Sequence, residues 1–284
     1  MRFPSGLAID WVGKVFIADS QNNRIRLLAG TSNSELPPTI QVNQVVGPSA
    51  FGSAATAPGS WIEIYGSNMS SVARSWSAQD FDGTTAPHSL SGTSVTIAGR
   101  DAFVSYVSPY QVNALVPFDV APGQQTVTIT TSSGTSASGV VTVNATQPGL
   151  LAPASFKINS QQYAGATFPD GTYAIPSLAI SGVASRPARP SETIILYGIG
   201  FGEVTPYVNS GEIVQTTNSL NHSVEITIGG LPARVTYAGL APGSVGLYQF
   251  NVVVPELASS DAVPLTYSLD GIQGTQTLYI AVRN

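Results

Sequence analysis

The chain contains no cysteine, and this absence excludes three kinds of chemistry at once. Without thiols there is no disulfide bond, no thiolate ligand for a metal ion and no cysteine nucleophile. The absence does not fix the cellular compartment, because a chain that buries a sufficient core folds outside the cell without disulfides.

Charged residues are scarce as well, since they make up 10% of the 284 residues, against about 25% in a typical soluble protein. The 16 acidic residues outnumber the 11 lysines and arginines, which gives a net charge of −5. Nucleic acids and anionic membrane surfaces bind to clusters of cations. The composition therefore predicts no nucleic-acid partner and no attachment to an anionic membrane.

Long apolar runs are absent too. No run reaches the roughly 18 residues of a membrane-spanning helix, so the sequence predicts no membrane span. Residues 1–6 contain an arginine that no apolar stretch follows, and they therefore do not match a signal peptide.

What the chain does contain is a long internal repeat. The two copies share a Thr-Ile-x-Gly motif with a tyrosine behind it, and then a Gln-x-Asn motif. These shared segments are Thr96-Ile97-Ala98-Gly99, Tyr106 and Gln111-Val112-Asn113 in the first copy, and Thr227-Ile228-Gly229-Gly230, Tyr237 and Gln249-Phe250-Asn251 in the second. The interval from Thr96 to Thr227 is too long for a propeller blade or a solenoid turn, so the repeated unit is a whole domain.

Within each copy, short apolar runs alternate with turn signals about every 10 residues, and no stretch has the 3.6-residue period of a helix. This rhythm predicts an all-β fold with two immunoglobulin-like β-sandwich domains, at residues 58–147 and 183–284. Residues 148–182 are rich in turn residues, so we expect an extended connector with one hairpin that turns at Asp170-Gly171.

The N-terminal residues 1–30 hold three short apolar runs around the turn signal Gly13-Lys14. Their pattern resembles one NHL repeat, which is one blade of a β-propeller in that family. A single blade cannot close a propeller, so we expect a remnant blade, with Met1 either a start inside a longer ancestral gene or the boundary of a cloned fragment. Residues 31–57 are expected to form a linker and a leading strand at about residues 40–46.

A family resemblance follows from motifs spread over about residues 40–284. They are Ser108-Pro109-Tyr110-Gln111-Val112-Asn113 with Pro117, and Tyr237-Ala238-Gly239-Leu240-Ala241-Pro242-Gly243 with Tyr248-Gln249-Phe250-Asn251 and Pro255. They resemble the uncharacterised C-terminal domain family of soil acidobacteria of the Solibacter type. Each half also resembles an IPT/TIG immunoglobulin-like domain, in which a glycine-rich early turn corresponds to Tyr65-Gly66-Ser67-Asn68 and to Tyr197-Gly198-Ile199-Gly200-Phe201-Gly202. The resemblance implies a fold and an extracytoplasmic, secreted setting in the parent protein, but no activity.

The repeated Gln-x-Asn pairs place two amides on one face of a strand. They either line a polar groove for a sugar or a peptide, or satisfy backbone groups at a sheet edge or at the domain junction. Their presence in both copies favours the structural role.

The best candidate for a metal site is Asp80-Phe81-Asp82-Gly83, because calcium prefers oxygen ligands and this run resembles the front half of a calcium loop. Asp80 and Asp82 are thus the candidate ligands, and calcium is the one cofactor that the sequence suggests. The closing glutamate of such a loop is missing, and the alternative is a solvated acidic loop.

The only two histidines, His88 and His222, each precede the same repeated strand. With Ser219 and Ser223 near His222, they are the candidate catalytic residues, since a Ser-His-Asp triad is a matter of geometry and not of spacing. No G-x-S-x-G motif accompanies them. The alternative is a surface histidine in each copy and a polar turn around His222.

Among the aromatic residues, Trp76 lies in a polar loop and Tyr207 in a turn-rich segment, so both are candidate platforms for a sugar ring. Trp61 lies within a strand and is expected in the core.

Three functions remain open. The leading hypothesis is an extracytoplasmic bacterial binding, spacer or adhesion module without catalysis, whose partner is a glycan or a cell-surface protein. The second is a calcium-assisted hydrolase of small esters or lactones, such as acyl-homoserine lactones. The third is a carbohydrate-binding module. Because shared residues serve the scaffold, function is expected where the copies differ, at 70–89, 148–182 and 238–245.

Overall fold

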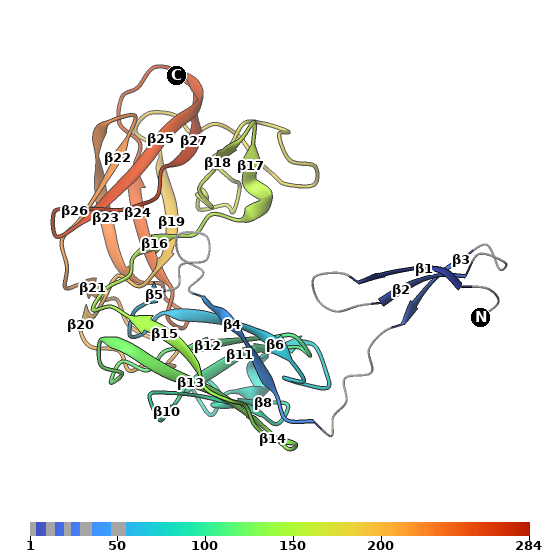
Figure 1. Cartoon of the computed structure of the whole chain (residues 1–284). Helices are drawn as coiled ribbons and strands as arrows, with labels where there is room; N and C mark the ends of the chain where they lie inside the picture. The colour runs from blue at the N-terminus through green and yellow to red at the C-terminus, as the bar shows by residue number, and fades with distance from the viewer. Residues whose placement is uncertain (1–3, 10–14, 20–23, 29–35, 47–54) are drawn as a thin grey trace.

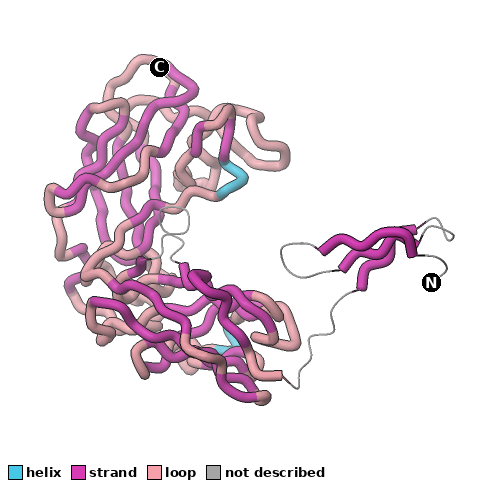
Figure 2. The backbone as a smooth tube through the Cα atoms, in the orientation of Figure 1, coloured by secondary structure: helices cyan, strands magenta, loops and turns pink. Residues whose placement is uncertain are grey.

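The computed structural model describes residues 4–9, 15–19, 24–28, 36–46 and 55–284. The regular secondary structure of these residues is almost entirely β-strand, with two short 3-10 helices, η3 (Ala78–Asp80) and η4 (Ala154–Phe156) (Figure 2). The predicted all-β fold is thus confirmed. Neither helical segment in this described part of the chain is long or apolar enough to cross a membrane.

Near the N-terminus a three-stranded antiparallel sheet has the order β1-β2-β3 (Figure 1). Its strands are β1 (Pro4–Ile9), β2 (Val15–Asp19) and β3 (Arg24–Leu28), which coincide with the three apolar runs of the sequence. The predicted turn at Gly13-Lys14 lies outside the described residues, as does most of the predicted linker, at 31–35 and 47–54.

The first repeat copy folds as two facing sheets, with the orders β4-β6-β12-β11-β7 and β10-β9-β13-β15-β5. Two short strands lie beside this second path, since β8 pairs with β9 and β14 with β13. The strands are β4 (Thr39–Val46), β5 (Ala55–Thr56), β6 (Trp61–Ser67), β7 (Arg74–Ser75), β8 (Ser89–Leu90), β9 (Thr93–Ile97), β10 (Arg100–Asp101), β11 (Phe103–Val107), β12 (Gln111–Leu115), β13 (Gly123–Thr131), β14 (Gly134–Thr135) and β15 (Gly139–Val143).

The core of the first sandwich lies between its sheets because successive side chains of a strand point to opposite faces. In β6, Ile62 and Ile64 are buried, while the residues that alternate with them, Trp61, Glu63 and Tyr65, are half-exposed. Val95 of β9 and Val127 of β13 meet them from the other sheet, in the same apolar cluster. Apolar burial of this kind stabilises a fold by about 25 cal/mol for each Å² removed from water.

The second copy forms a sandwich whose two halves are joined through the long strand β23, which pairs with β24 on one side and with β22 on the other. The strand order is β16-β19-β24-β23-β22-β25-β26, and β27 pairs with β25. The strands are β16 (Gly149–Leu150), β19 (Thr193–Ile199), β22 (Val224–Ile228), β23 (Leu231–Leu240), β24 (Tyr248–Val253), β25 (Ser260–Leu269), β26 (Ile272–Gln273) and β27 (Leu278–Val282), with the short pairs β17 (Lys157–Ile158) and β18 (Gln161–Gln162), and β20 (Val204–Thr205) and β21 (Ser219–Leu220).

The segment at 148–182 contributes to the core of this second sandwich. Leu150, Ala166 and Phe168 are buried there among the strand residues. The predicted turn at Asp170-Gly171 is present, because the Gly171 N–H donates to the Phe168 carbonyl and the Asp170 carboxylate accepts the Thr172 N–H. The core of the second sandwich therefore includes residues from outside the repeated segment.

The two copies agree in detail. Val112 pairs with Ile64 in the first copy, as Phe250 pairs with Leu196 in the second. The strand after the Thr-Ile-x-Gly motif has a register shift in each copy, between Val104 and Tyr106 and between Val235 and Tyr237. Cross-strand threonine pairs also recur, Thr96 with Thr128 and Thr227 with Thr266, with 2.6 Å between their hydroxyl oxygens.

One difference from the expectation concerns the extra loop at 238–245. Its first residues continue β23 to Leu240, which pairs with Tyr248, so that the loop begins only at Ala241. The added residues lengthen the strand because Ala238, Gly239 and Leu240 continue its antiparallel register with β24, and the Leu240 N–H donates to the Asn218 Oδ1.

Candidate binding groove between the two domains

The two sandwiches contact each other through backbone hydrogen bonds between loops. The Ala86 N–H donates to the Gly211 carbonyl over 2.8 Å, and the Ile213 N–H donates to the Thr84 carbonyl over 2.8 Å. The Ser210 hydroxyl accepts the Phe118 N–H over 2.7 Å. The junction is therefore an ordered interface, with a fixed pairing of the loop at 82–86 and the loop at 209–213.

At this junction a glycine lies directly on an aromatic ring. Gly211 has a φ of +76°, and a Cβ atom placed on it would be 2.3 Å from the ring of Phe103. Phe103 is itself 7% exposed. The close approach requires a residue without a side chain, for which the left-handed backbone conformation also carries no penalty.

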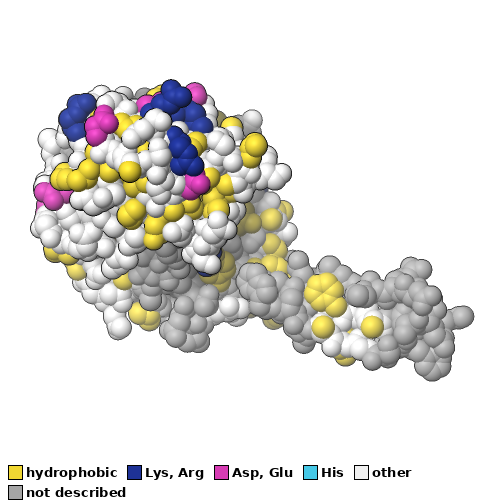
Figure 3. All heavy atoms as spheres, turned by 90° about the horizontal axis from the view of Figure 1, so that it is seen from above, with side chains coloured by type: hydrophobic (Ala, Val, Ile, Leu, Met, Phe, Trp, Pro, Cys, Tyr) yellow, Lys and Arg dark blue, Asp and Glu magenta, His cyan; other side chains and the backbone are white. Residues whose placement is uncertain are grey.

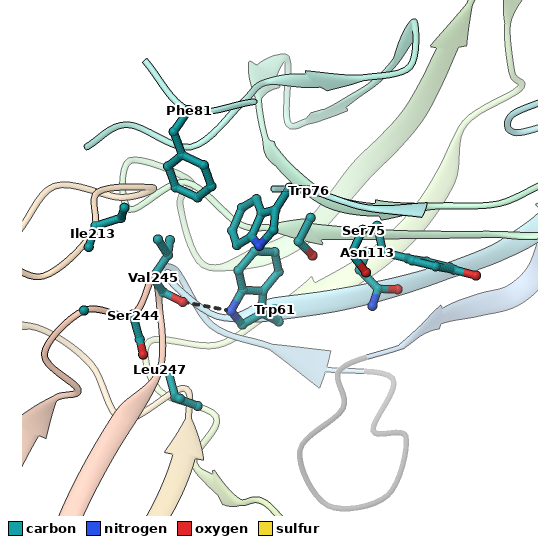
Figure 4. Close-up of a pocket in the computed structure, with 12 residues that line it drawn as sticks. Trp61, Ser75, Trp76, Phe81, Asn113, Ile213, Ser244, Val245 and Leu247 are labelled. Carbon is teal, nitrogen blue, oxygen red and sulfur yellow. Dashed lines mark hydrogen bonds between the residues drawn. The ribbon is translucent and has the colours of Figure 1, made fainter. Parts of the chain in front are cut away.

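A groove of about 540 Å³ opens next to this interface, between the two sandwiches (Figure 4). The first domain contributes β6, β11, β12 and the loop at 75–81, and the second contributes the turn at 243–247 and Ile213. The lining residues are Trp61, Ser75, Trp76, Phe81, Ser105, Tyr106, Asn113, Ile213, Gly243, Ser244, Val245 and Leu247. Two of the three regions where the copies differ, 70–89 and 238–245, thus meet here.

Three aromatic rings form one wall of the groove. The rings of Trp61 and Trp76 meet edge to face, with centroids 5.4 Å apart and planes at 76°. The ring of Phe81 is tilted against Trp76 at a centroid distance of 4.9 Å. All three are half-exposed. Edge-to-face contacts hold aromatic rings in a defined orientation, so the wall is preorganised.

The position of Trp61 within a strand predicts that it lies in the core of its domain. In the structure it lies at the junction of the two domains instead. The alternation of β6 puts it on the face opposite Ile62. Its indole N–H donates to the Val245 carbonyl of the other domain over 3.3 Å (Figure 4). This hydrogen bond fixes the ring of Trp61 and ties the first domain to the turn that closes the groove.

The polar groups of the groove have hydrogen-bonding capacity to spare. Gln111 donates from Nε2 to the Asn113 Oδ1 over 2.8 Å, which leaves the Asn113 Nδ2 donors available. Within the described part of the chain, four lining hydroxyls and one indole N–H have no hydrogen-bonding partner. They belong to Ser75, Ser105, Tyr106, Ser244 and Trp76.

None of the lining residues carries a charged side chain. The surface seen in Figure 3 is likewise mostly uncharged, with acidic and basic side chains lying next to one another. Aromatic faces, hydroxyls and an amide in an uncharged groove can bind a neutral polar molecule with apolar patches.

Asp80, the first predicted calcium ligand, lies beside the groove in an ion pair. Arg74 donates from Nη1 and Nη2 to the two carboxylate oxygens of Asp80, over 2.9 and 2.7 Å. The Ser77 N–H donates to the same carboxylate over 2.7 Å. The hydrogen bonds from the Arg74 guanidinium lower the pKa of the Asp80 carboxyl well below its ordinary value, and the bond from the Ser77 N–H lowers it further.

Asp82, the second predicted ligand, is exposed, and its backbone pairs with Thr85. In the part of the chain that the structure describes, no group of three or more histidine or acidic side chains could hold a metal ion. A calcium ion at Asp80 would have to displace Arg74. The acidic run thus serves to anchor the loop that carries Trp76 and Phe81.

His88 lies against the same aromatic residue as Gly211. Its ring stacks on Phe103 with centroids 4.1 Å apart, and its Nδ1 is 3.2 Å from the Ala102 carbonyl oxygen. These contacts support the domain junction and bring no candidate nucleophile to the imidazole.

His222 is part of a second, smaller pocket at the junction, of about 280 Å³. Its Nδ1 is 2.6 Å from the Asp270 Oδ2, and the hydrogen bond to His222 lowers the pKa of Asp270. The Ser223 N–H donates to the other oxygen of Asp270 over 2.8 Å. Among the described residues, the hydroxyls of Ser219 and Ser223 form no hydrogen bond with His222. The predicted histidine and serines are therefore near one another in sequence but do not form a triad.

Tyr207, the other predicted platform, lies apart from the groove. It is 57% exposed and packs against Phe118 of the first domain, with ring centroids 5.9 Å apart. Of the two predicted aromatic platforms, only Trp76 lines the groove. Two further aromatic residues line the groove: Phe81 lies within the acidic run, and Tyr106 is shared by both copies, which the comparison of the copies assigns to the scaffold.

No protein-family model matches the chain, and no curated protein matches it by sequence. Solved structures with some similarity to this fold include the SGBP-B protein of the Bacteroides ovatus mixed-linkage glucan utilization locus, in complex with a mixed-linkage heptasaccharide. It is 13% identical with a TM-score of 0.37, over 95% of this chain and 53% of that one.

Another is a Gamma-CGTASE of an alkalophilic Bacillus clarkii, 14% identical with a TM-score of 0.28, over 99% of this chain and 31% of that one. Domains 5–6 of the S-layer protein SbsC are 16% identical with a TM-score of 0.27, over 87% of this chain and 99% of theirs. The chain spans less than two thirds of the length of the first two structures. Likenesses at these TM-scores identify neither a ligand nor an activity for this chain.

Proposed function

We propose that this chain is a non-catalytic, extracytoplasmic bacterial binding module that takes a glycan into the groove between its two domains. The observation that carries the proposal is the meeting of the aromatic wall with unpaired hydroxyl and amide groups at one ordered junction. Sugar rings present apolar C–H faces and a rim of hydroxyls, which match such a lining of aromatic faces and a few placed polar groups.

The setting of the module is part of the proposal. The repeated Gln-x-Asn and tyrosine motifs support our proposal that the chain belongs to the Solibacter-type C-terminal domain family, and the pattern of residues 1–30 supports an NHL-type blade there. The low charge of the chain fits a binding or spacer module without catalysis.

Glycan binding to the purified chain tests the function. We expect a glycan array to give binders, and Trp76→Ala to abolish their binding because it removes the half-exposed centre of the aromatic wall. Tyr207→Ala is the matched control, since Tyr207 is an exposed aromatic residue near the junction but outside the groove. Binding that survives Trp76→Ala, or that Tyr207→Ala removes instead, would refute the groove as the site.

A second candidate function is the hydrolysis of a small ester or lactone in the pocket of His222, such as an acyl-homoserine lactone. The specific observation is the Asp270–His222 pair, which anchors Nδ1 and leaves Nε2 for a water molecule in a pocket that Glu203 and Asn221 also line. An imidazole oriented by a carboxylate is the arrangement of a general base.

Esterase and lactonase assays of the purified chain, with calcium and with EDTA, test this second candidate. Activity that depends on the pair should fall at least about tenfold in His222→Ala and persist in His88→Ala, since one proton-transfer group typically contributes 10²–10⁴-fold. No activity at high protein concentration with calcium present, or equal activity in both variants, would eliminate the hydrolase.

A further inference from the structure

The groove has a feature that narrows its ligand class further. Its lining has no charged side chain, and Arg74, the neighbour in sequence of the lining residue Ser75, is held by both carboxylate oxygens of Asp80. An acidic sugar would therefore lose water from its carboxylate without gaining a cation in return, which is costly.

A carboxylate also borders the groove. Glu63 of β6 lies directly opposite Asn113 in the antiparallel pairing of β6 with β12. Residues opposite each other in such a pair have side chains on the same face. An anionic ligand that contacts Asn113 would thus lie beside a like charge, in a chain whose net charge is already −5.

The donors and acceptors of the groove match hydroxyl groups. A serine or tyrosine hydroxyl both donates and accepts, and so does a sugar hydroxyl, whereas a carboxylate or a sulfate only accepts. Asn113 supplies two fixed donors, because its Oδ1 already accepts the bond from Gln111. Its orientation comes from within the scaffold and is in place before a ligand arrives.

The repeat supplies a comparison for this amide pair. Gln249 donates to the Asn251 Oδ1 over the same 2.8 Å, but Asn251 is not among the residues that line the groove. The same amide–amide hydrogen bond is thus present in both copies, and only in the first copy does the groove make its free N–H donors available to a ligand.

We propose that the groove selects uncharged glycans and excludes acidic ones, with Glu63 and the uncharged lining disfavouring an anion and Asn113, positioned by Gln111, donating to a sugar hydroxyl. This inference rests on the proposed glycan-binding function. Recognition then depends on stacking and on hydrogen bonds between neutral groups, and it needs no divalent cation.

The test compares neutral and acidic oligosaccharides on the purified full chain by titration calorimetry. The neutral probes are cello-, xylo- and manno-oligosaccharides, and the acidic probes are oligogalacturonates and oligoalginates. We expect binding of at least one neutral probe, with the same affinity at about 50 mM and about 500 mM NaCl and in EDTA, because no ion pair is screened. We expect no binding of the acidic probes.

Two variants at Asn113 and one control separate recognition from folding. Asn113→Ala and the nearly isosteric Asn113→Asp should each weaken binding of the neutral probe about three- to tenfold or more, as the loss of one or two hydrogen bonds implies. Asn251→Ala, which removes the matching side chain of the second copy, should leave the affinity unchanged.

Acidic probes that bind as tightly as neutral ones, an affinity that falls with salt, or equal affinities of Asn113→Ala and Asn251→Ala would overturn the inference while leaving glycan binding intact. A wild-type chain that binds none of these probes nor any glycan on an array would refute the proposed function, and the inference with it.

Discussion

The contact of Gly211 with Phe103 gives a sharp prediction about what holds the domains together. In Gly211→Ala the new methyl group would lie 2.3 Å from a ring atom that is itself buried, so that either the ring or the loop must move. Overpacking of this kind typically costs about 1–3 kcal/mol. The left-handed conformation at φ +76° adds about 1–2 kcal/mol for any residue with a side chain.

A second glycine separates these two costs. Gly230 has a φ of +78°, but a Cβ atom placed on it would meet nothing within 4 Å. Gly230→Ala should therefore show only the backbone cost, of about 1–2 kcal/mol. The difference between the two variants, about 1–3 kcal/mol, isolates the steric contact at the domain junction.

Differential scanning calorimetry of the three proteins measures this difference. For chains of this size, 1 kcal/mol corresponds to a shift in Tm of roughly 2–4 °C. We expect Gly211→Ala to melt several degrees below Gly230→Ala. Equal Tm values, within about 1 °C, would mean that the ring of Phe103 yields without cost and that this contact does not hold the domains.

Three further predictions concern buried and paired polar groups. The Tyr267 hydroxyl donates to the Pro148 carbonyl over 2.6 Å, and burial raises the pKa of Tyr267 to about 12. A tyrosine in the unfolded chain ionises near pH 10. The contribution of Tyr267 to stability is therefore lost as the pH rises between about 10 and about 12. The gap in unfolding free energy between wild type and Tyr267→Phe, about 1 kcal/mol at neutral pH, should narrow in that range, and a constant gap would contradict the assignment. Because Arg74 lowers the pKa of Asp80, their contribution is present above about pH 4 and is lost as the pH falls below it; the Tm deficit of Arg74→Ala should shrink at acid pH, and a deficit that grows there would argue against the pair. The Oγ1 of Thr56 is buried and has no hydrogen-bonding partner among the described residues, and an unpaired buried hydroxyl costs about 1–3 kcal/mol. Thr56→Val should therefore be neutral or raise the unfolding free energy by about 1 kcal/mol in denaturant titration, and a clear loss would mean that the hydroxyl has a partner in solution.

The strands of both sandwiches could be predicted because their burial follows the period of two in the sequence. In β6 the alternation from Trp61 to Ser67 is complete, and the inner residues are Ile62, Ile64 and Gly66. Alternation gives the faces of a strand, but it does not say what covers each face. Trp61 was expected in the core for this reason, and it covers the domain junction instead.

The candidate site could be predicted only in part. Comparison of the copies pointed to 70–89 and 238–245 as places for function, and both contribute to the groove. That they meet depends on how one sandwich packs on the other, which local patterns do not encode. The same holds for His222, whose partner Asp270 is brought near by the pairing of β22 with β25, a register that composition alone does not reveal.

Acidic residues show a further limit of sequence patterns. The spacing of Asp80 and Asp82 is typical of a calcium loop, but Arg74 lies six positions before Asp80 and takes its carboxylate. Whether a carboxylate binds a metal ion or a guanidinium depends on which of them the fold places next to it. The sequence of a loop without regular structure does not determine the distance between the carboxylate and a nearby arginine.

The hydrogen bond from Trp61 to Val245 has an evolutionary consequence. It joins a residue of one ancestral copy to a turn that only the other copy possesses, so the groove did not exist before the gene segment was doubled. A recombination event that transferred either half alone would transmit only one side of the cavity. Selection for the ligand would therefore keep the pair, and the length of the turn at 241–247, as one inherited unit.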